Sequence, residues 1–263
     1  EMAVLIQEVV GTRMGRYYMP AFAGVAFSRN EFRWSPRIQH KDGLLRLVPG
    51  LGTRAVDRVG DDYPVLASPG QPGLKVNQSI DEVIRYSPRK ADVINLETND
   101  FETVEIRDLL GECGAAWPAF AEIFSVIRHD MLERPAPLLL DMSCEEVAAT
   151  FNGLVSSTDF VPRIAAILKT LEECLGHPVD IEFAHDGKHF HLLQCRPQNS
   201  TEESAPAPIP KDLPARDVVF TARKFISNGW VPDLTHVVYV DPTGYSALPP
   251  HQDLVAVGRA VSK

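Results

Sequence analysis

The chain has 263 residues, 44% of them hydrophobic, which is enough for one large domain with a buried core plus a smaller piece and argues against disorder as a whole. Its net charge of -9 and its scattered basic residues exclude a basic surface for a phosphodiester backbone, so we expect no nucleic-acid partner. No apolar run approaches the roughly 20 residues of a membrane-spanning helix, so we expect no membrane association.

The cysteines are widely spaced and form no Cys-x-x-Cys pair, which argues against a zinc ribbon and against a dense disulfide scaffold. We interpret them as reduced thiols and expect a cytoplasmic protein. They are Cys113, Cys144, Cys174 and Cys195.

Two strand pairs are predicted in the first half of the chain. Residues 4–10 and 24–27 read as strands of a hairpin with a long tip, and the sequence offers no earlier segment with which the first could pair. The closely spaced glycines of 50–52 allow a tight turn or a close backbone approach. Residues 91–96 and 101–106 are the second pair, rich in β-branched side chains and joined by a polar turn.

Three helices are predicted next. The first covers 116–131, and the second covers 143–151 with a capping box between Ser143 and Glu146. The third carries an apolar stripe at helical spacing and ends at Gly176, where a left-handed cap is expected, so it should pack on a sheet. The stripe consists of Ile164, Leu168, Leu171 and Leu175.

The end of the chain reads as a separate part. Residues 198–214 have the Ser, Glu and Pro composition of a solvated linker. Residues 215–263 follow as the start of a small α/β domain, with a strand at 235–240, a turn at 241–244 and a helix in the last dozen residues. Because this last helix stops without a cap and the first strand starts without a partner, we expect the chain to be a segment of a longer polypeptide.

Residues 179–197 form the most informative stretch, a predicted β-hairpin with Asp-Gly at its turn. On its first strand Asp180 and Glu182 share one face because side chains alternate, while Ile181 and its apolar neighbours face the core. Two carboxylates on one strand face outline a site for a hard cation.

The length of the turn decides which residues of the second strand join these acids. A three-residue loop at 185–187, with glycine left-handed, places Phe190, Leu192, Gln194 and Arg196 beside them. A two-residue loop at 186–187 places His189, His191 and Leu193 there instead. The residues alone leave both registers open.

The pattern Asp-Ile-Glu-Phe at 180–183 followed by Leu-Leu-Gln-Cys-Arg-Pro at 192–197 resembles the closing strands of the ATP-grasp domain in phosphoenolpyruvate synthases and pyruvate phosphate dikinases. Residues 3–10 resemble the adenine-hinge strand of that family, 24–29 its following strand, and Gly-Leu-Gly at 50–52 the start of its glycine segment. The resemblance implies an α+β fold, with residues 1–197 as the C-terminal part of an ATP-grasp-like antiparallel sheet with packed helices.

The same resemblance implies site residues and the cofactors ATP and Mg2+. Glu182 and Gln194 would be the metal ligands and Arg196 the catalytic phosphate contact, which requires the longer loop. The residues implied in nucleotide binding are Gln7, Glu8, Val10 and Asp180.

For function, the resemblance implies a phosphotransferase that passes a phosphoryl group from ATP through a phosphohistidine to pyruvate. The family's N-terminal subdomain and phosphohistidine domain are not in this chain, so we expect the chain alone to be inactive and those parts to be its partners. Two alternatives stand beside this hypothesis: a degenerate ATP-grasp module with a regulatory or structural role, and a dikinase for another acceptor such as a glucan or an antibiotic.

The histidines of the predicted hairpin suggest a transition-metal site, since two histidines at i and i+2 share a strand face. Only Cys195 is near enough in sequence to add a ligand to His185, His189 and His191, so we expect exposed strand histidines instead. The chain contains no Gly-x-x-x-x-Gly-Lys-Ser/Thr phosphate loop, which argues against a P-loop kinase.

Overall fold

A computed structural model of the chain describes residues 6–56, 62–136, 146–198, 213–218, 221, 226–227, 235–246 and 252–261. The chain divides into two compact units. The first comprises Glu1–Glu203 and Pro210–Asn228, and the second comprises Ser204–Ile209 and Gly229–Lys263. We describe each unit by itself.

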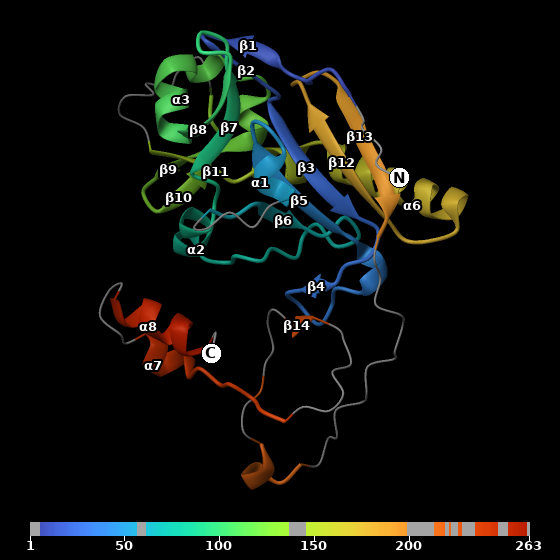
Figure 1. Ribbon diagram of the computed structural model, residues 1–263, viewed down its shortest axis with the longest axis vertical. Coiled ribbons are helices and arrows are strands. Elements are labelled where there is room, and N and C mark those ends of the chain that lie inside the picture. The colour runs from blue at the N-terminus through green and yellow to red at the C-terminus, as the bar shows by residue number, and fades with distance from the viewer. Residues whose placement is uncertain are drawn as a thin grey trace. The chain divides into compact units, whose positions relative to one another are not determined.

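A five-stranded antiparallel sheet, which we call the central sheet, organises the first unit (Figure 1). Its order is β13-β12-β3-β5-β6, so strands far apart in sequence are neighbours. The bounds are β3 Phe22–Phe27, β5 Leu44–Pro49, β6 Val65–Ala67, β12 Val179–His185 and β13 Phe190–Pro197.

Smaller sheets accompany the central sheet. A four-stranded sheet has the order β1-β2-β7-β8, a three-stranded sheet has the order β10-β9-β11, and β4 pairs with β14. Their strands are β1 Thr12–Met14, β2 Tyr17–Met19, β4 Phe32–Arg33, β7 Lys90–Asn95, β8 Asp100–Glu105, β9 Phe124–Arg128, β10 Met131–Glu133, β11 Glu146–Ala149 and β14 Ile226–Ser227.

Among the described residues of the first unit, the helices are short except for one. They are α1 Thr53–Val56, α2 Ile80–Arg85, α3 Ile106–Cys113, α4 Phe120–Ile123, α5 Asn152–Ser157 and α6 Phe160–Leu175, with 3-10 turns at His40–Asp42, Gly114–Ala116 and Ala215–Asp217. The second unit contains α7 Pro242–Ser246 and α8 Gln252–Val261. Among the described residues, no helix combines the length and apolar character that a membrane crossing needs.

The helix α6 packs against β12 and β3 as its apolar stripe predicts. Ile164 and Leu168 are buried in the main core, whereas Leu175 at the end of the stripe is half exposed. Gly176 ends the helix with φ +74° and donates its N–H to the carbonyl of Glu172. The left-handed glycine cap is therefore confirmed. The β7–β8 pair also agrees with the sequence, each strand beginning and ending one residue before the predicted bounds.

The first predicted strand is wrong. Residues 1–5 lie outside the described part, and residues 6–10 form no strand. Side chains attach this segment instead: Gln7 Nε2 donates to the Leu193 carbonyl at 3.0 Å, and the Tyr18 hydroxyl donates to the Val9 carbonyl at 3.1 Å. The observed hairpin joins β1 to β2 through Gly15, whose φ is +60°.

Two predicted helices are also wrong. Within 116–131 only α4 is α-helical, and the chain then enters β9, which pairs with β11. The capping serine at 143 lies outside the described residues, but Glu146–Ala149 is strand β11. Both errors have one cause, since short apolar segments adopt whichever structure tertiary pairing offers.

The tail differs from its prediction in part. The helix α8 is confirmed, but residues 235–240 form no strand and the predicted turn is the start of helix α7. The Asp241 carboxylate accepts from the Gly244 N–H at 2.6 Å, which favours the helical turn. Most of the predicted linker at 198–214 lies outside the described residues, so that boundary stays a prediction.

Candidate functional site

The register of β12 and β13 brings the predicted metal ligands together. Glu182 lies directly opposite Gln194, and Asp180 directly opposite Arg196. Residues opposite each other in an antiparallel pair point to the same face. The four side chains therefore share one face of the central sheet, as the longer-loop register predicts.

The reason for this register differs from the prediction. The loop has four residues, Asp186 to His189, because β12 ends at His185 and β13 begins at Phe190. An irregularity between Glu182 and Phe183 leaves Leu193 as an extra residue in β13 and shifts the register by one. The extra residue of this bulge, and not the length of the loop, therefore sets Glu182 opposite Gln194.

Between the bulge and the loop, the pairing corrects a further expectation. Phe183 lies opposite Leu192, and Ala184 lies opposite His191. Phe190 packs on the buried ring of Phe183 at a centroid distance of 5.3 Å. Neither Phe190 nor Leu192 therefore lies beside the acids, and His191 lies on their face instead.

The face extends across the sheet and contains a second cation that the sequence analysis missed. Glu182 lies opposite Val25 on β3, and Val25 lies opposite Arg46 on β5. The Arg46 guanidinium carbon stands 5.1 Å from the ring centroid of Phe27. We call the set Asp180, Glu182, Gln194, Arg196 and Arg46 the polar face. Arg46 is the single charged residue of its strand, which is the signal that could have identified it.

The electrostatics of the polar face centre on Arg196. Its Nε donates to both carboxylate oxygens of Asp180, at 2.7 and 3.0 Å, and its Nη2 stands 3.7 Å from Glu182 Oε1. The hydrogen bond to Asp180 raises the pKa of Arg196, although partial burial acts in the opposite direction. The Asp180 carboxylate is only 7% exposed, and because it accepts both of these hydrogen bonds it holds the Arg196 guanidinium in place. Both Nη groups of Arg196 keep donors that form no hydrogen bond within the described part of the chain.

The donor set fits Mg2+ that arrives with a nucleotide. Mg2+ in proteins is usually held by one or two side-chain oxygens, with water and substrate phosphates completing its six ligands. Glu182 and Gln194 supply one carboxylate and one carboxamide on a common face. The described residues contain no group of three or more His, Cys, Asp or Glu side chains placed to hold a metal alone. A site completed by phosphate oxygens agrees with both observations.

The segment 6–10 lies beside this site. The carbonyl that accepts from Gln7 belongs to Leu193, the bulge residue next to Gln194. Glu8 is exposed, and Val10 is partly buried. The structure therefore brings Gln7 to the edge of the polar face, and the nucleotide-binding roles of Gln7, Glu8 and Val10 stay predictions.

The glycine turn is fixed by buried charges that the sequence analysis did not single out. Gly50 has φ +73°, and a Cβ there would lie 2.6 Å from the Asp92 carbonyl, so only glycine fits. Leu51 N–H donates to the same carbonyl at 2.9 Å, and the Thr53 hydroxyl donates to the Asp92 carboxylate. Arg54 completes the network at 3.5 Å from Asp92 Oδ1. The turn is thus anchored on β7, while Ala55 of α1 packs on the central sheet.

The three histidines of the hairpin differ from the expected exposed strand residues. His185 is partly buried and stacks on Phe22 at a centroid distance of 4.9 Å, and burial lowers its pKa. His189 is exposed but lies in the loop, and His191 is partly buried. The Asp186 Oδ2 atom stands 3.3 Å from ring nitrogens of both His189 and His191.

Asp186 closes the loop and gives it a testable pH dependence. Burial alone would raise the pKa of Asp186, but hydrogen bonds from the backbone N–H groups of His189 and Lys188 and from two histidine rings outweigh it. The pKa is held well below the ordinary value of about 4. At about pH 4 the Asp186 carboxylate takes up a proton in the unfolded chain but stays ionised in the folded state. The stabilisation of the folded state by Asp186 is therefore complete above about pH 4 and is lost as the pH falls further.

We expect Asp186→Asn to lower the free energy of unfolding by about 1 kcal/mol at pH 7, since one charge-assisted set of hydrogen bonds becomes neutral. The difference from the wild type should shrink below about pH 4, because the wild type alone loses stability there. Urea unfolding of both proteins at pH 7 and pH 3 measures this. A difference that is constant over this range would show that Asp186 is not stabilised as a carboxylate.

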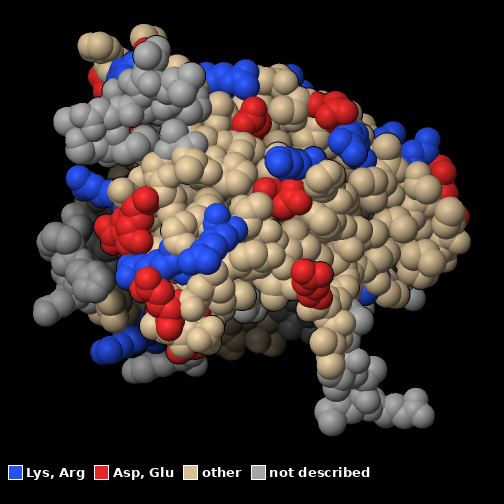
Figure 2. Space-filling view, turned by 90° about the horizontal axis from the view of Figure 1, so that it is seen from above, with Lys and Arg blue, Asp and Glu red and all other residues tan. Residues whose placement is uncertain are grey.

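Charged side chains are mixed on the face shown in Figure 2, where Lys and Arg lie singly or beside Asp and Glu. Arg16 and Glu112 form an ion pair at 2.7 Å, with both side chains about 40% exposed. The sequence-based expectation of no nucleic-acid partner stays a prediction.

Comparison with known families decides the identity of the fold. The model of the pyruvate phosphate dikinase AMP/ATP-binding domain matches residues 1–217. The chain belongs to this family. No curated protein matches the chain.

Membership in the dikinase AMP/ATP-binding family confirms the resemblance seen in the closing strands. The match includes the glycine turn, the central sheet and the β12–β13 hairpin. The α+β, ATP-grasp-like fold class is confirmed, and the chain is the ATP-binding part of a protein of the pyruvate phosphate dikinase and phosphoenolpyruvate synthase kind. Helices α7 and α8 lie beyond the match.

Proposed function

We propose that the polar face of the central sheet binds the phosphates of Mg-ATP. Glu182 and Gln194 hold the metal ion, and Arg196 contacts the phosphoryl group that is transferred. The observation that carries this proposal is the register that sets Glu182 opposite Gln194 and Asp180 opposite Arg196. An acid pair without the carboxamide and the arginine would be an ordinary solvated strand face.

Within this proposal, each residue has a physical role. Asp180 holds the Arg196 guanidinium through Nε, so the Nη groups can donate to phosphate oxygens. When bound, Mg2+ would offset the phosphate charge. Arg196 stabilises the charge that develops as the phosphoryl group leaves, so the contribution of this chain is positioning and electrostatics. Arg46 supplies a second positive charge on the same face.

We further propose that the parent enzyme is a phosphoenolpyruvate synthase-like phosphotransferase. The bond from phosphorus to the ATP oxygen breaks as a bond to a histidine nitrogen forms. In the second step that phosphorus–nitrogen bond breaks, the nitrogen keeps the electron pair, and the phosphoryl group bonds to the enolate oxygen of pyruvate, whose methyl group has lost a proton. The acceptor histidine belongs to the family's phosphohistidine domain. The other half of the phosphate clamp belongs to the family's N-terminal subdomain, so the 263-residue chain alone is expected to bind ATP weakly and to be inactive.

The test uses the full-length parent protein incubated with Mg2+, ATP and pyruvate. Formation of phosphoenolpyruvate, followed by 31P NMR, supports the proposal. ATP binding without any turnover would instead support a regulatory module. Consumption of ATP that requires another acceptor, with no phosphoenolpyruvate formed, would overturn the assignment of pyruvate while leaving the phosphate site intact.

A further inference from the structure

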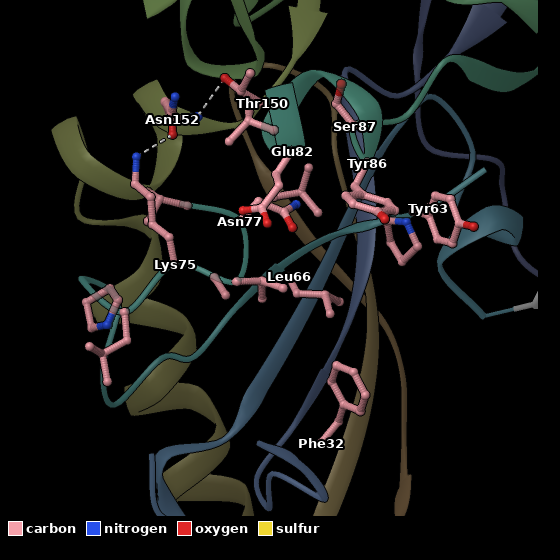
Figure 3. Close-up of a pocket in the computed structure, with 18 residues that line it drawn as sticks. Phe32, Tyr63, Leu66, Lys75, Asn77, Glu82, Tyr86, Ser87, Thr150 and Asn152 are labelled. Atoms are coloured by element: carbon pink, nitrogen blue, oxygen red, sulfur yellow. Dashed lines mark hydrogen bonds between the residues drawn. The ribbon is translucent and has the colours of Figure 1, made fainter. Parts of the chain in front are cut away.

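A cavity of about 420 Å³ lies at the β6 edge of the central sheet (Figure 3). It opens beside β6, which is one edge strand, whereas β13 is the other. With strands about 4.8 Å apart, roughly 14 to 19 Å separates β6 from β12 and β13, which contain Glu182, Gln194 and Arg196. Arg46 of the polar face is nearer, since it lies directly opposite Leu66 of β6. None of the polar-face residues lines the cavity. It is therefore a second site, and ligand binding there does not depend on the proposed function.

The walls of the cavity are mostly apolar and partly aromatic. Leu66 of β6, Val83 of α2 and Phe32 contribute to them. Tyr63 and Tyr86 meet edge to face at a centroid distance of 5.5 Å, and both are about 40% exposed. Pockets of roughly 300–1,000 Å³ with apolar walls and a few polar groups are typical small-molecule sites. The cavity suits a small molecule with an aromatic body.

One cation and one carboxamide in the lining keep hydrogen-bonding capacity. Lys75 Nζ donates to Asn152 Oδ1 at 3.1 Å and forms no ion pair with the described residues. The Asn77 side chain, which is partly buried, has no hydrogen-bond partner among those residues either. An ammonium group has three donors, so Lys75 can still bind an anion.

The single acidic residue of the lining is already engaged. Glu82 Oε2 accepts from the backbone N–H groups of Gln78 and Ser79 at 3.0 and 3.4 Å, as part of the capping box of α2. The helix N-terminus thus offsets the negative charge of Glu82. Among the described residues that line the cavity, Lys75 therefore carries a positive charge without a counter-ion.

We propose that the cavity binds a small aromatic carboxylate. The ring occupies the apolar part between Leu66, Val83 and Tyr86, and the carboxylate pairs with the Lys75 ammonium, with the Asn77 amide as a second donor. A neutral ligand of the same shape gains the apolar contacts but leaves the ammonium without an anion, and a cation is repelled by it. A triphosphate carries more charge than this one lysine can balance.

The test compares indole-3-acetate with indole-3-acetamide, which share a shape and differ in charge. Ligand-observed NMR titrations of the full 263-residue chain measure both dissociation constants. We expect the acid to bind at least about tenfold tighter than the amide. Lys75→Met should remove this preference and leave the amide affinity unchanged, whereas Val83→Trp, which fills the cavity, should abolish the binding of both.

Lys188→Met serves as the matched control, since Lys188 is exposed at the tip of the β12–β13 hairpin and does not line the cavity. It should behave as the wild type. Thermal melts of each variant verify that it is folded. The proposal is overturned if the acid shows no binding at millimolar concentration, if Lys75→Met keeps the preference, or if Val83→Trp still binds either compound.

Discussion

Replacement of Glu182 by alanine is expected to lower the rate of phosphoenolpyruvate formation by the full-length protein by at least about 100-fold. The glutamate lies opposite Gln194 and supplies the carboxylate of the proposed metal pair. Without it, Arg196 faces phosphate oxygens whose charge is less neutralised, and the nucleotide loses its fixed orientation. Because the effect acts on the transition state, the turnover number should fall more than the affinity for ATP.

Glu173→Ala is the matched control for that experiment, since Glu173 lies on the exposed side of α6 and pairs only at the surface with Lys169, at 3.8 Å. Its rate should stay within about twofold of the wild type. Steady-state kinetics on the three proteins give the comparison. Equal rates for Glu182→Ala and Glu173→Ala would remove Glu182 from the site.

The largest effect on stability is expected at Gly24, in the middle of the central sheet. A Cβ at this position would lie 2.2 Å from the Arg46 carbonyl and 2.7 Å from the Phe183 ring. A rotamer change can move the ring, but the carbonyl belongs to the β5 backbone, so the strands themselves would have to separate. We expect Gly24→Val to lower the free energy of unfolding by about 3 kcal/mol.

Gly73→Val provides the control for this measurement, because Gly73 is exposed and, apart from its two chain neighbours, no residue has an atom within 4 Å of its Cβ position. It should change the free energy of unfolding by no more than about 0.5 kcal/mol. Chemical denaturation followed by circular dichroism compares the two. If both variants unfold at the wild-type midpoint, the close approach of β3, β5 and Phe183 is not present in solution.

The sequence predicts the hairpin 179–197 and the helix before it because both have strong local signals. Apolar residues at helical spacing and a glycine cap define α6, and alternation places Asp180 and Glu182 on one face. The correct pairing of Glu182 with Gln194 is predicted through the family resemblance. The bulge at Leu193 that produces it has no signal in the residues.

What the sequence cannot predict depends on partners distant in the chain. The segment Phe124–Arg128 is too short for its apolar residues to distinguish helix from strand, and it forms β9 beside β11. Arg46 joins the polar face only because β3 is inserted between β5 and β12. Such long-range sheet contacts are fixed by the fold, whereas local periodicity reports only on the segment itself.

The most direct test of the metal pair is a calorimetric titration of the full-length protein with ATP, with and without Mg2+. It is done on the wild type and on a variant that carries both Glu182→Gln and Gln194→Leu. We expect Mg2+ to raise the ATP affinity of the wild type at least about tenfold and that of the variant by no more than about twofold. The same Mg2+-dependent gain in both proteins would contradict a metal site between these two strands.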